Sequence, residues 1–234
     1  MQDPSLARMP VFDSSGARDG TASSHAYRAL RYAIRRGDLV LGEIYSIGQV
    51  AERLNISRTP VREAVCRLEA EALVDVLPQR GFRLRAISEA EIEEFFTLRE
   101  MLESYVARTL VSRGDPSVVP ALMEMIDRQE RSIDDEEFLH LAEEIHIAMA
   151  ELAGLSRVAW ILNALRGQLW MLGTHSILQP NRRRAAIAEH RAIVDCIARR
   201  DGVAAAKAIR DHLANNAEAQ HEQQAHSGHA CLTP

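Results

Sequence analysis

The segment Ile56–Ala64 reads ISRTPVREA and decides the fold of the N-terminal part of the chain. It starts on a short turn and continues into a helix predicted over residues 58–72. Pro60 is tolerated there because an amide in the first turn of a helix has no intrahelical acceptor. Arg58 and Arg62 are four residues apart, so they project from one face of this helix. Its valine and leucine residues lie on the opposite face, which makes one face basic and the other apolar.

The flanking sequence predicts the other elements of a winged helix. Ser46 is placed to cap a short helix upstream, and Pro78–Gly81 is a turn between two β-rich stretches downstream. The predicted elements are helices over residues 24–36, 47–54 and 58–72 and strands over residues 73–77 and 82–86. Three helices followed by a hairpin form a winged helix-turn-helix, whose last helix enters the major groove of DNA.

The residues at the start of this last helix are candidates for contacts with DNA. Arginine donates two hydrogen bonds to guanine O6 and N7, and one such pair discriminates between bases by about 1–3 kcal/mol. We therefore predict that Arg58 and Arg62 read bases, with Ser57 and Thr59 bonding bases or phosphates beside them. At the wing tip, the dipeptide Arg80-Gly81 is predicted to enter a groove or to meet a phosphate.

The string from Ile56 to Ala64, with Arg67–Glu69 after it and a glycine in the hairpin, resembles the GntR family of bacterial regulators. The resemblance covers residues 24–87, and the family's SRTPVREA core is unsubstituted. It implies base contacts for the two arginines of the helix, a backbone or base contact for the threonine between them, and a DNA-contacting wing. Gly48 stands where some relatives carry a further DNA-contacting arginine, and Glu63 is interpreted as orienting a neighbouring arginine.

Charge is distributed unevenly along the chain. The formal net charge is -5, but residues 24–87 hold eleven Arg, no Lys and seven Asp or Glu, a net of +4. This asymmetry favours a DNA-facing module joined to an acidic one. No stretch approaches the roughly 20 apolar residues of a membrane-spanning helix, and the polar start lacks a secretory signal, so we expect a cytoplasmic protein without a membrane partner.

The three cysteines argue against a disulfide framework or a thiolate zinc site. Cys66, Cys196 and Cys231 are far apart in the sequence and form no C-x-x-C pair. We interpret Cys66 and Cys196 as small core residues, because a buried free cysteine usually behaves as a small hydrophobic residue.

The sequence changes character after Ile87 and predicts helices alone. Ser88–Glu91 is a capping box, and apolar residues follow it at helical spacing. Further helices are expected near residues 117–131, 135–152, 155–177, 181–200 and 202–224. The predicted fold class is mainly α. Its parts are a flexible tail over 1–22, a winged helix-turn-helix over 23–87, an all-α antiparallel helical bundle over 88–225 and a flexible tail over 226–234. Trp160 and Trp170 are expected to pack within the bundle.

Three histidines of the helical part are candidate metal ligands. His146, His190 and His212 lie on different predicted helices, each beside apolar neighbours that indicate a partly buried face. Three converging imidazoles suit Zn, Ni, Cu or Fe, because neutral ring nitrogens are good ligands for transition metals. Their spacing alone does not show that they converge, and a structural cluster of hydrogen-bonded histidines remains the alternative.

The helical part resembles the FCD effector domain that follows many GntR winged helices. The motifs that carry this resemblance are Arg99-x-x-x-Glu103, Ile145-His146, Glu189-His190 and Asp211-His212-Leu213. The resemblance implies that the histidines line a central cavity and bind a divalent transition metal, with Zn or Ni favoured, and that a small carboxylate completes the coordination. The family's usual fourth ligand is an aspartate four residues before the first histidine, where this chain has Ala142. Glu143, water or the effector carboxylate are the substitutes we consider.

Arg99 has two open roles, a bidentate bond to an effector carboxylate and an ion pair with Glu103 one turn later. The function predicted from the whole sequence is a ligand-responsive transcription regulator, in the first instance a repressor. It would bind a palindromic operator as a homodimer and sense a small organic acid. The alternative is a metal-dependent small-molecule enzyme or binding protein. We expect no enzyme, because no nucleophile-base pair or activated-water motif accompanies the histidines.

Overall fold

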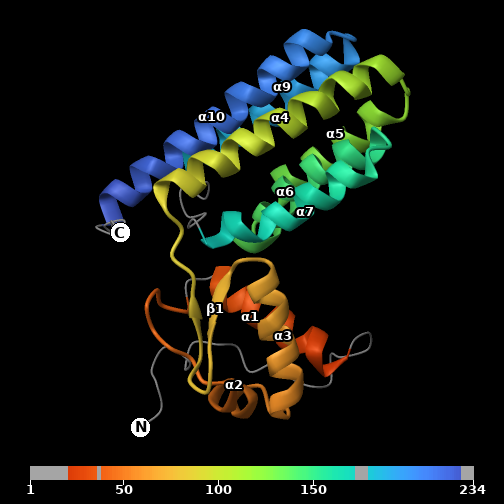
Figure 1. The fold of residues 1–234 in the computed structure, drawn as a ribbon. Coiled ribbons are helices and arrows are strands. Elements are labelled where there is room, and N and C mark those ends of the chain that lie inside the picture. The colour runs from red at the N-terminus through yellow and green to blue at the C-terminus, as the bar shows by residue number, and fades with distance from the viewer. Residues whose placement is uncertain (1–20, 36–37, 172–178, 228–234) are drawn as a thin grey trace. The chain divides into compact units, whose positions relative to one another are not determined.

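The computed structural model describes residues 21–35, 38–171 and 179–227 (Figure 1). The described residues divide into two compact units, one of residues up to 87 together with 167–171, and one of residues 88–166 and 179–227. The tails predicted over 1–22 and 226–234 lie almost wholly outside the described residues, as does the end of the helix predicted over 155–177. None of the described helices is long and apolar enough to span a lipid bilayer.

The first unit is a winged helix, as the sequence predicts. Its elements are α1 (Ala22–Arg35), α2 (Ile47–Arg53), α3 (Arg58–Ala70), β1 (Val74–Leu77) and β2 (Gly81–Leu84). The two strands pair in an antiparallel sheet, and Tyr45 adds a single bridge to it through two backbone hydrogen bonds with Phe82. The rings of these two residues are fully buried, in a core that α1 and α3 share with the sheet.

A helix cap and a glycine determine the local backbone structure of this unit. The Ser46 hydroxyl accepts a hydrogen bond from the Gln49 backbone amide, and Oε1 of Gln49 accepts one from the Ser46 backbone amide, so the predicted cap of α2 is confirmed as a capping box. Gly81 at the wing has a φ of +126° and lies against the backbone of Tyr45, where an added Cβ would fall 2.1 Å from the carbonyl oxygen. Only glycine fits this position.

The second unit is a bundle of helices (Figure 1). They are α4 (Glu89–Arg113), α5 (Val118–Arg131), α6 (Asp135–Leu152), α7 (Ser156–Met171), α9 (Pro180–Ala198) and α10 (Gly202–Ser227). The capping box predicted at Ser88 is confirmed, and Gly114 ends α4 in the left-handed conformation. α10 packs along α4 and α9, while α5 packs along α6 and α9. The mainly α fold class is therefore confirmed.

Two packing predictions are wrong. Cys66 is exposed, because it follows Arg62 by four residues and so lies on the solvent face of α3 rather than on its apolar face. Trp160 is 69% exposed, because the inward face of α7 is taken by Ala159 and Leu162. Cys196 is buried as predicted, and the side chain of Trp170 lies outside the described residues.

Candidate nucleic-acid interface and metal centre

Helix α3 separates a polar, exposed face from a buried, apolar one. Ser57, Arg58, Thr59 and Arg62 are all exposed. The buried residues of the helix are Val61, Ala64, Val65 and Leu68. Ser57 is the N-cap residue but makes no capping hydrogen bond with its side chain, so the hydroxyl keeps its bonding capacity for another partner. All four candidate contacts of this segment therefore face solvent together.

The start of α2 borders this exposed face, and the tip of the wing is exposed as well. Arg80 is exposed at the tip of the hairpin, next to Gly81. An added Cβ at Gly48 would lie 3.4 Å from Nη2 of Arg58, so the guanidinium rests against this glycine. The sequence marks Gly48 only as a missing arginine, whereas the geometry makes it the surface that supports a neighbouring one. Glu63 is also exposed, and its orienting role stays a prediction.

A cluster of polar side chains joins α1 to the end of α3. The Tyr27 hydroxyl donates to Oε1 of Glu71 at 2.5 Å and accepts from Nη1 of Arg31 at 2.6 Å. The guanidinium carbon of Arg67 lies 3.9 Å from the centre of the Tyr27 ring. Burial and the hydrogen bond to Glu71 raise the pKa of Tyr27. Sequence reasoning missed this cluster, which fixes the placement of α3 within its unit.

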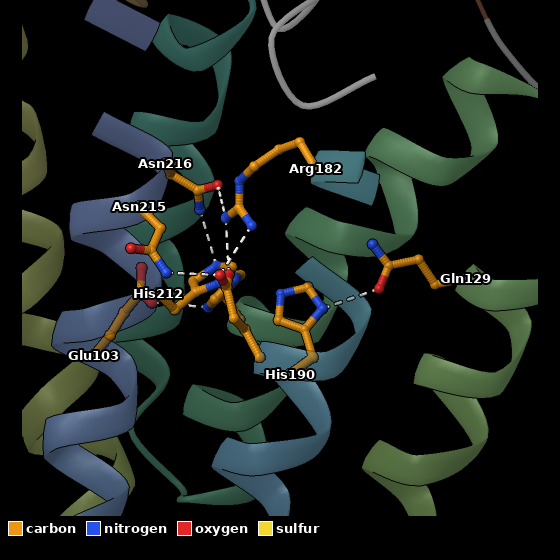
Figure 2. Close-up of polar contacts among 9 residues, drawn as sticks. Glu103, Gln129, Arg182, His190, His212, Asn215 and Asn216 are labelled. Carbon is orange, nitrogen blue, oxygen red and sulfur yellow. Dashed lines mark hydrogen bonds and ion pairs between the residues drawn. The ribbon is translucent and has the colours of Figure 1, made fainter. Parts of the chain in front are cut away.

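In the helical unit, three helices bring together the three predicted histidines, and Figure 2 labels two of them, His190 and His212. His146 lies on α6, His190 on α9 and His212 on α10, and all three are buried. Their ring centres are 4.7–5.2 Å apart. One nitrogen of each ring lies within 4.8 Å of one nitrogen of the others. Such a group has the composition and the proximity of a transition-metal site.

Each imidazole of this cluster has an oxygen atom close to its Nδ1, which forms a hydrogen bond in His190 and His212 and a close contact without hydrogen-bond geometry in His146. The three pairs are His146 with Glu103 Oε2 at 2.8 Å, His190 with Gln129 Oε1 at 2.9 Å, and His212 with Glu189 Oε2 at 2.7 Å. A hydrogen on Nδ1 leaves the lone pair of a neutral ring on Nε2, which is the arrangement that metal-binding histidines use. Nε2 of His190 is buried and has no hydrogen-bond partner among the described residues.

The electrostatics of the cluster favour uncharged rings. Burial, together with the charges of the neighbouring histidines, holds the pKa of His190 well below its usual value. Burial also lowers the pKa of His212 to about 4, against the opposing effect of Glu189. Burial opposes ionisation of Glu189, but hydrogen bonds from His212 and Arg182 lower its pKa to about 2. At neutral pH both rings are therefore able to bind a cation.

Two arginines hold the carboxylates of the cluster. Nε of Arg99 donates to Oε1 of Glu103 at 2.6 Å, and both side chains are buried. Burial opposes ionisation of Glu103, but Arg99 and His146 together lower its pKa to about 2. The ion pair considered for Arg99 is thus present, and its bond to an effector stays a prediction.

Arg182, which sequence reasoning missed, donates hydrogen bonds from Nη1 and Nη2 to the two carboxylate oxygens of Glu189 at 2.9 and 2.8 Å. Its Nη2 also donates to Oδ1 of Asn216 at 2.6 Å, and Asn215 donates to Glu189 at 2.7 Å. The signal available in the sequence was a set of polar residues on helix faces that are otherwise buried.

Comparisons with known proteins agree with both halves of this description. Residues 22–84 match the family model described as bacterial regulatory proteins, gntR family, and residues 94–215 match the FCD domain. A relative from Streptomyces ambofaciens, an uncharacterised HTH-type transcriptional regulator in an unstable DNA locus, is 33% identical over 191 residues, 80% of each chain. The protein belongs to the GntR family. Its winged helix is followed by an FCD domain.

A further relative supports the same class for this GntR regulator, and solved structures support its fold. The HTH-type transcriptional repressor RspR of Escherichia coli K12 is 28% identical over 80% of this chain and 83% of its own. The structure of E. coli McbR/YncC has a TM-score of 0.73 at 18% identity, and it covers 88% of this chain and 99% of its own. A regulator from Rhodococcus has a TM-score of 0.69 at 21% identity, with coverage of 86% and 97%. The family and these relatives indicate a DNA-binding transcription regulator.

This GntR regulator lacks a carboxylate in the position that the FCD resemblance predicts. Ala142 lies on α6 one turn before His146 and offers no ligand atom. Glu143 is buried. Within the described part of the chain, the group of ligand atoms that lie within 4.8 Å of one another consists of the three histidines and does not include Glu143. Glu143 therefore does not join the three histidines as a candidate ligand among the described residues.

Proposed function

We propose that this protein is a repressor that binds a palindromic operator as a homodimer and senses a small organic acid in a metal-containing cavity of its FCD domain. The observation that carries the proposal is the pairing of two sites in one chain. An exposed arginine face lies on α3, and a buried group of three histidines with oriented rings lies in the helical unit. The first site suits DNA and the second suits a metal with its ligand.

The exposed face of α3 is proposed to read the operator. Arg58 and Arg62 bond guanines in the major groove, where a bidentate guanidinium recognises O6 and N7. Ser57 and Thr59 stand at the positive end of the helix dipole and bond phosphates or base edges. Arg80 at the wing adds affinity through the backbone of the DNA. A two-fold dimer presents two such faces, which matches an operator with inverted half-sites.

The histidine cluster is proposed to hold a divalent transition metal, with Zn or Ni favoured. The buried and unpaired Nε2 of His190 supports this fit, because a buried polar atom without a partner is costly. Nε2 of all three histidines would bind the ion, which would supply a Lewis-acidic position for an acidic ligand. The Nδ1 partners Glu103, Gln129 and Glu189 keep the rings in the required orientation.

The effector is proposed to be a small carboxylate that completes the coordination and bonds Arg99. This arginine is buried beside the cluster and carries donors beyond the one that Glu103 occupies. The acid can change operator affinity only by binding one arrangement of the two winged helices more tightly than another. We propose that it favours the arrangement that does not fit the operator, so that ligand relieves repression.

The DNA-binding part of the proposal is tested with Arg58→Ala and Arg62→Ala. The probe is a DNA duplex that the wild-type protein selects from a random-sequence pool, and the readout is fluorescence anisotropy. Each variant should weaken binding by about 5- to 150-fold, which corresponds to about 1–3 kcal/mol. Arg28→Ala removes an exposed arginine from α1 and is the matched control. Undiminished binding by either variant, with circular dichroism unchanged, would contradict its role.

The metal part is tested by elemental analysis of protein purified without an affinity tag. Wild-type protein should contain close to one transition-metal ion per chain, and His190→Ala should contain much less. Equal metal in both samples, or none in the wild type after incubation with Zn²⁺, would refute the histidine site.

A further inference from the structure

Asn216 contacts the histidine cluster in a way that the other polar neighbours do not. It lies on α10 one turn after His212, and its side chain is buried. Glu103, Gln129 and Glu189 face the Nδ1 atoms, whereas Nδ2 of Asn216 lies 3.0 Å from Nε2 of His212 (Figure 2). A metal on His212 would need that same Nε2 lone pair. Asn216 is therefore at the coordination position itself and not in the layer of residues behind it.

We propose that Asn216 supplies the fourth protein ligand to the metal. It would replace the aspartate that the family usually has at the position of Ala142. The inference rests on the proposed metal site and identifies one of its ligands. The amide nitrogen cannot bind a metal, because its lone pair is delocalised, but the amide oxygen is an established ligand for divalent cations. A half-turn of the amide exchanges Nδ2 for Oδ1 and requires no change in the backbone of α10.

The spacing in the cluster agrees with this role. Metal–ligand bonds of about 2.0–2.1 Å in a tetrahedral site place neighbouring ligand atoms about 3.4 Å apart. The amide of Asn216 is already 3.0 Å from Nε2 of His212. Ala142 and Asn216 lie on different helices, α6 and α10, and each is four residues away from a histidine of the cluster. In this chain the fourth ligand would thus come from the turn after His212 instead of the turn before His146.

The half-turn also changes the partners of Arg182. Nη2 of this arginine now donates to Oδ1 of Asn216 at 2.6 Å, and its Nε is buried without a hydrogen-bond partner among the described residues. When Oδ1 turns to the metal, Arg182 faces an NH2 group and loses an acceptor. A carboxylate then restores the lost hydrogen bond. Metal loading would in this way prepare Arg182 to bind the organic acid.

Three variants of the full-length, metal-free protein test the assignment. Zn²⁺ affinity is measured by competition with a chromophoric chelator, and the visible absorption of bound Co²⁺ reports on the ligand set. Asn216→Ala should weaken Zn²⁺ binding by about 10- to 100-fold, comparable to the loss of other residues that support metal sites. Asn216→Asp should strengthen it, because a carboxylate adds negative charge in the same place. Asn163→Ala is the matched control, since it removes an exposed amide on α7 that takes part in none of the contacts of the cluster.

The outcomes separate this inference from the proposed function. Absence of Zn²⁺ binding in the wild type would refute the metal site and the ligand assignment together. Wild-type binding with unchanged affinity in Asn216→Ala, or with tighter binding in that variant, would overturn the assignment of Asn216 alone. If Asn216→Ala does not fold, Asn216→Asp decides the question, because weaker Zn²⁺ binding or an unchanged Co²⁺ spectrum in that variant contradicts direct coordination.

Discussion

The two units of this GntR regulator place their candidate functional residues in opposite ways. At the start of α3 the candidates are close together in sequence and exposed, and two of them, Arg58 and Arg62, carry a permanent charge. In the helical unit, the candidates come from three helices, are buried and depend on an outer layer of partners for their orientation. The comparison teaches that the first site needs only a correctly placed helix, whereas the second site needs the packing of the whole bundle.

The largest loss of stability should come from Gly81→Ala. This variant tests how far the DNA-binding face of α3 depends on the packing of the winged-helix unit. The new Cβ would fall 2.1 Å from the Tyr45 carbonyl oxygen at a φ of +126°. We expect a loss of more than about 3 kcal/mol in the free energy of unfolding of the winged helix, together with loss of DNA binding. Chemical denaturation and anisotropy measure the two effects, and Zn²⁺ binding should survive.

Gly42→Ala is the control for this variant, because Gly42 has a φ of +86° but no atom within 4 Å of an added Cβ. Gly42→Ala introduces backbone strain but no steric clash, so its loss of unfolding free energy should be clearly smaller. Equal costs for the two glycines would show that the close approach to Tyr45 contributes nothing.

A second prediction concerns the helical unit and its dependence on pH. The pKa of His212 is about 4 in the folded protein, against about 6.5 in an unfolded chain. Below pH 6.5 the unfolded chain therefore binds the additional proton, and stability falls as the pH falls. Metal-free protein should lose roughly 3 kcal/mol of unfolding free energy from this residue between pH 6.5 and 4. Urea denaturation at a series of pH values measures the loss.

His212→Gln should flatten this part of the profile, since glutamine does not titrate. The DNA-binding unit gives the contrast, because its candidate arginines keep their charge over the whole range. A profile that is the same in His212→Gln and in the wild type would contradict the burial-lowered pKa of His212.

A smaller effect is expected from Tyr27→Phe in the winged helix. The substitution keeps the ring beneath Arg67 but removes the hydroxyl that bonds Glu71 and Arg31. A hydrogen bond to a charged group contributes about 1.5–3 kcal/mol, so we expect a loss of about 2 kcal/mol confined to this unit. Tyr105→Phe, at a tyrosine that is 53% exposed on α4, is the control and should change little. A loss of Zn²⁺ binding in Tyr27→Phe would contradict an effect confined to this unit.

The difference between the units also explains what the sequence could predict. The segment ISRTPVREA, the caps at Ser46 and Ser88 and the turn before Gly81 are local signals, and they predicted the winged helix and the start of the bundle. The three histidines were identified as candidates, but their convergence depends on helix packing that spacing does not encode. The mistakes at Cys66 and Trp160 have the same origin, because the side of a helix that faces the core is decided by its neighbours.

The smallest effect is expected at Gly48, where the test is whether the side chain of Arg58 depends on its neighbour for its position. Gly48→Ala should stabilise α2 by about 0.5 kcal/mol through its helix propensity. Its Cβ would meet Nη2 of Arg58 at 3.4 Å, an ordinary contact, so operator binding should stay unchanged. Gly48→Leu carries further carbon atoms into the space of the guanidinium and should weaken binding, though less than Arg58→Ala. If Gly48→Leu binds the operator as tightly as Gly48→Ala, the placement of Arg58 on DNA does not depend on Gly48. The DNA-binding site would then need even fewer neighbouring residues than its geometry implies.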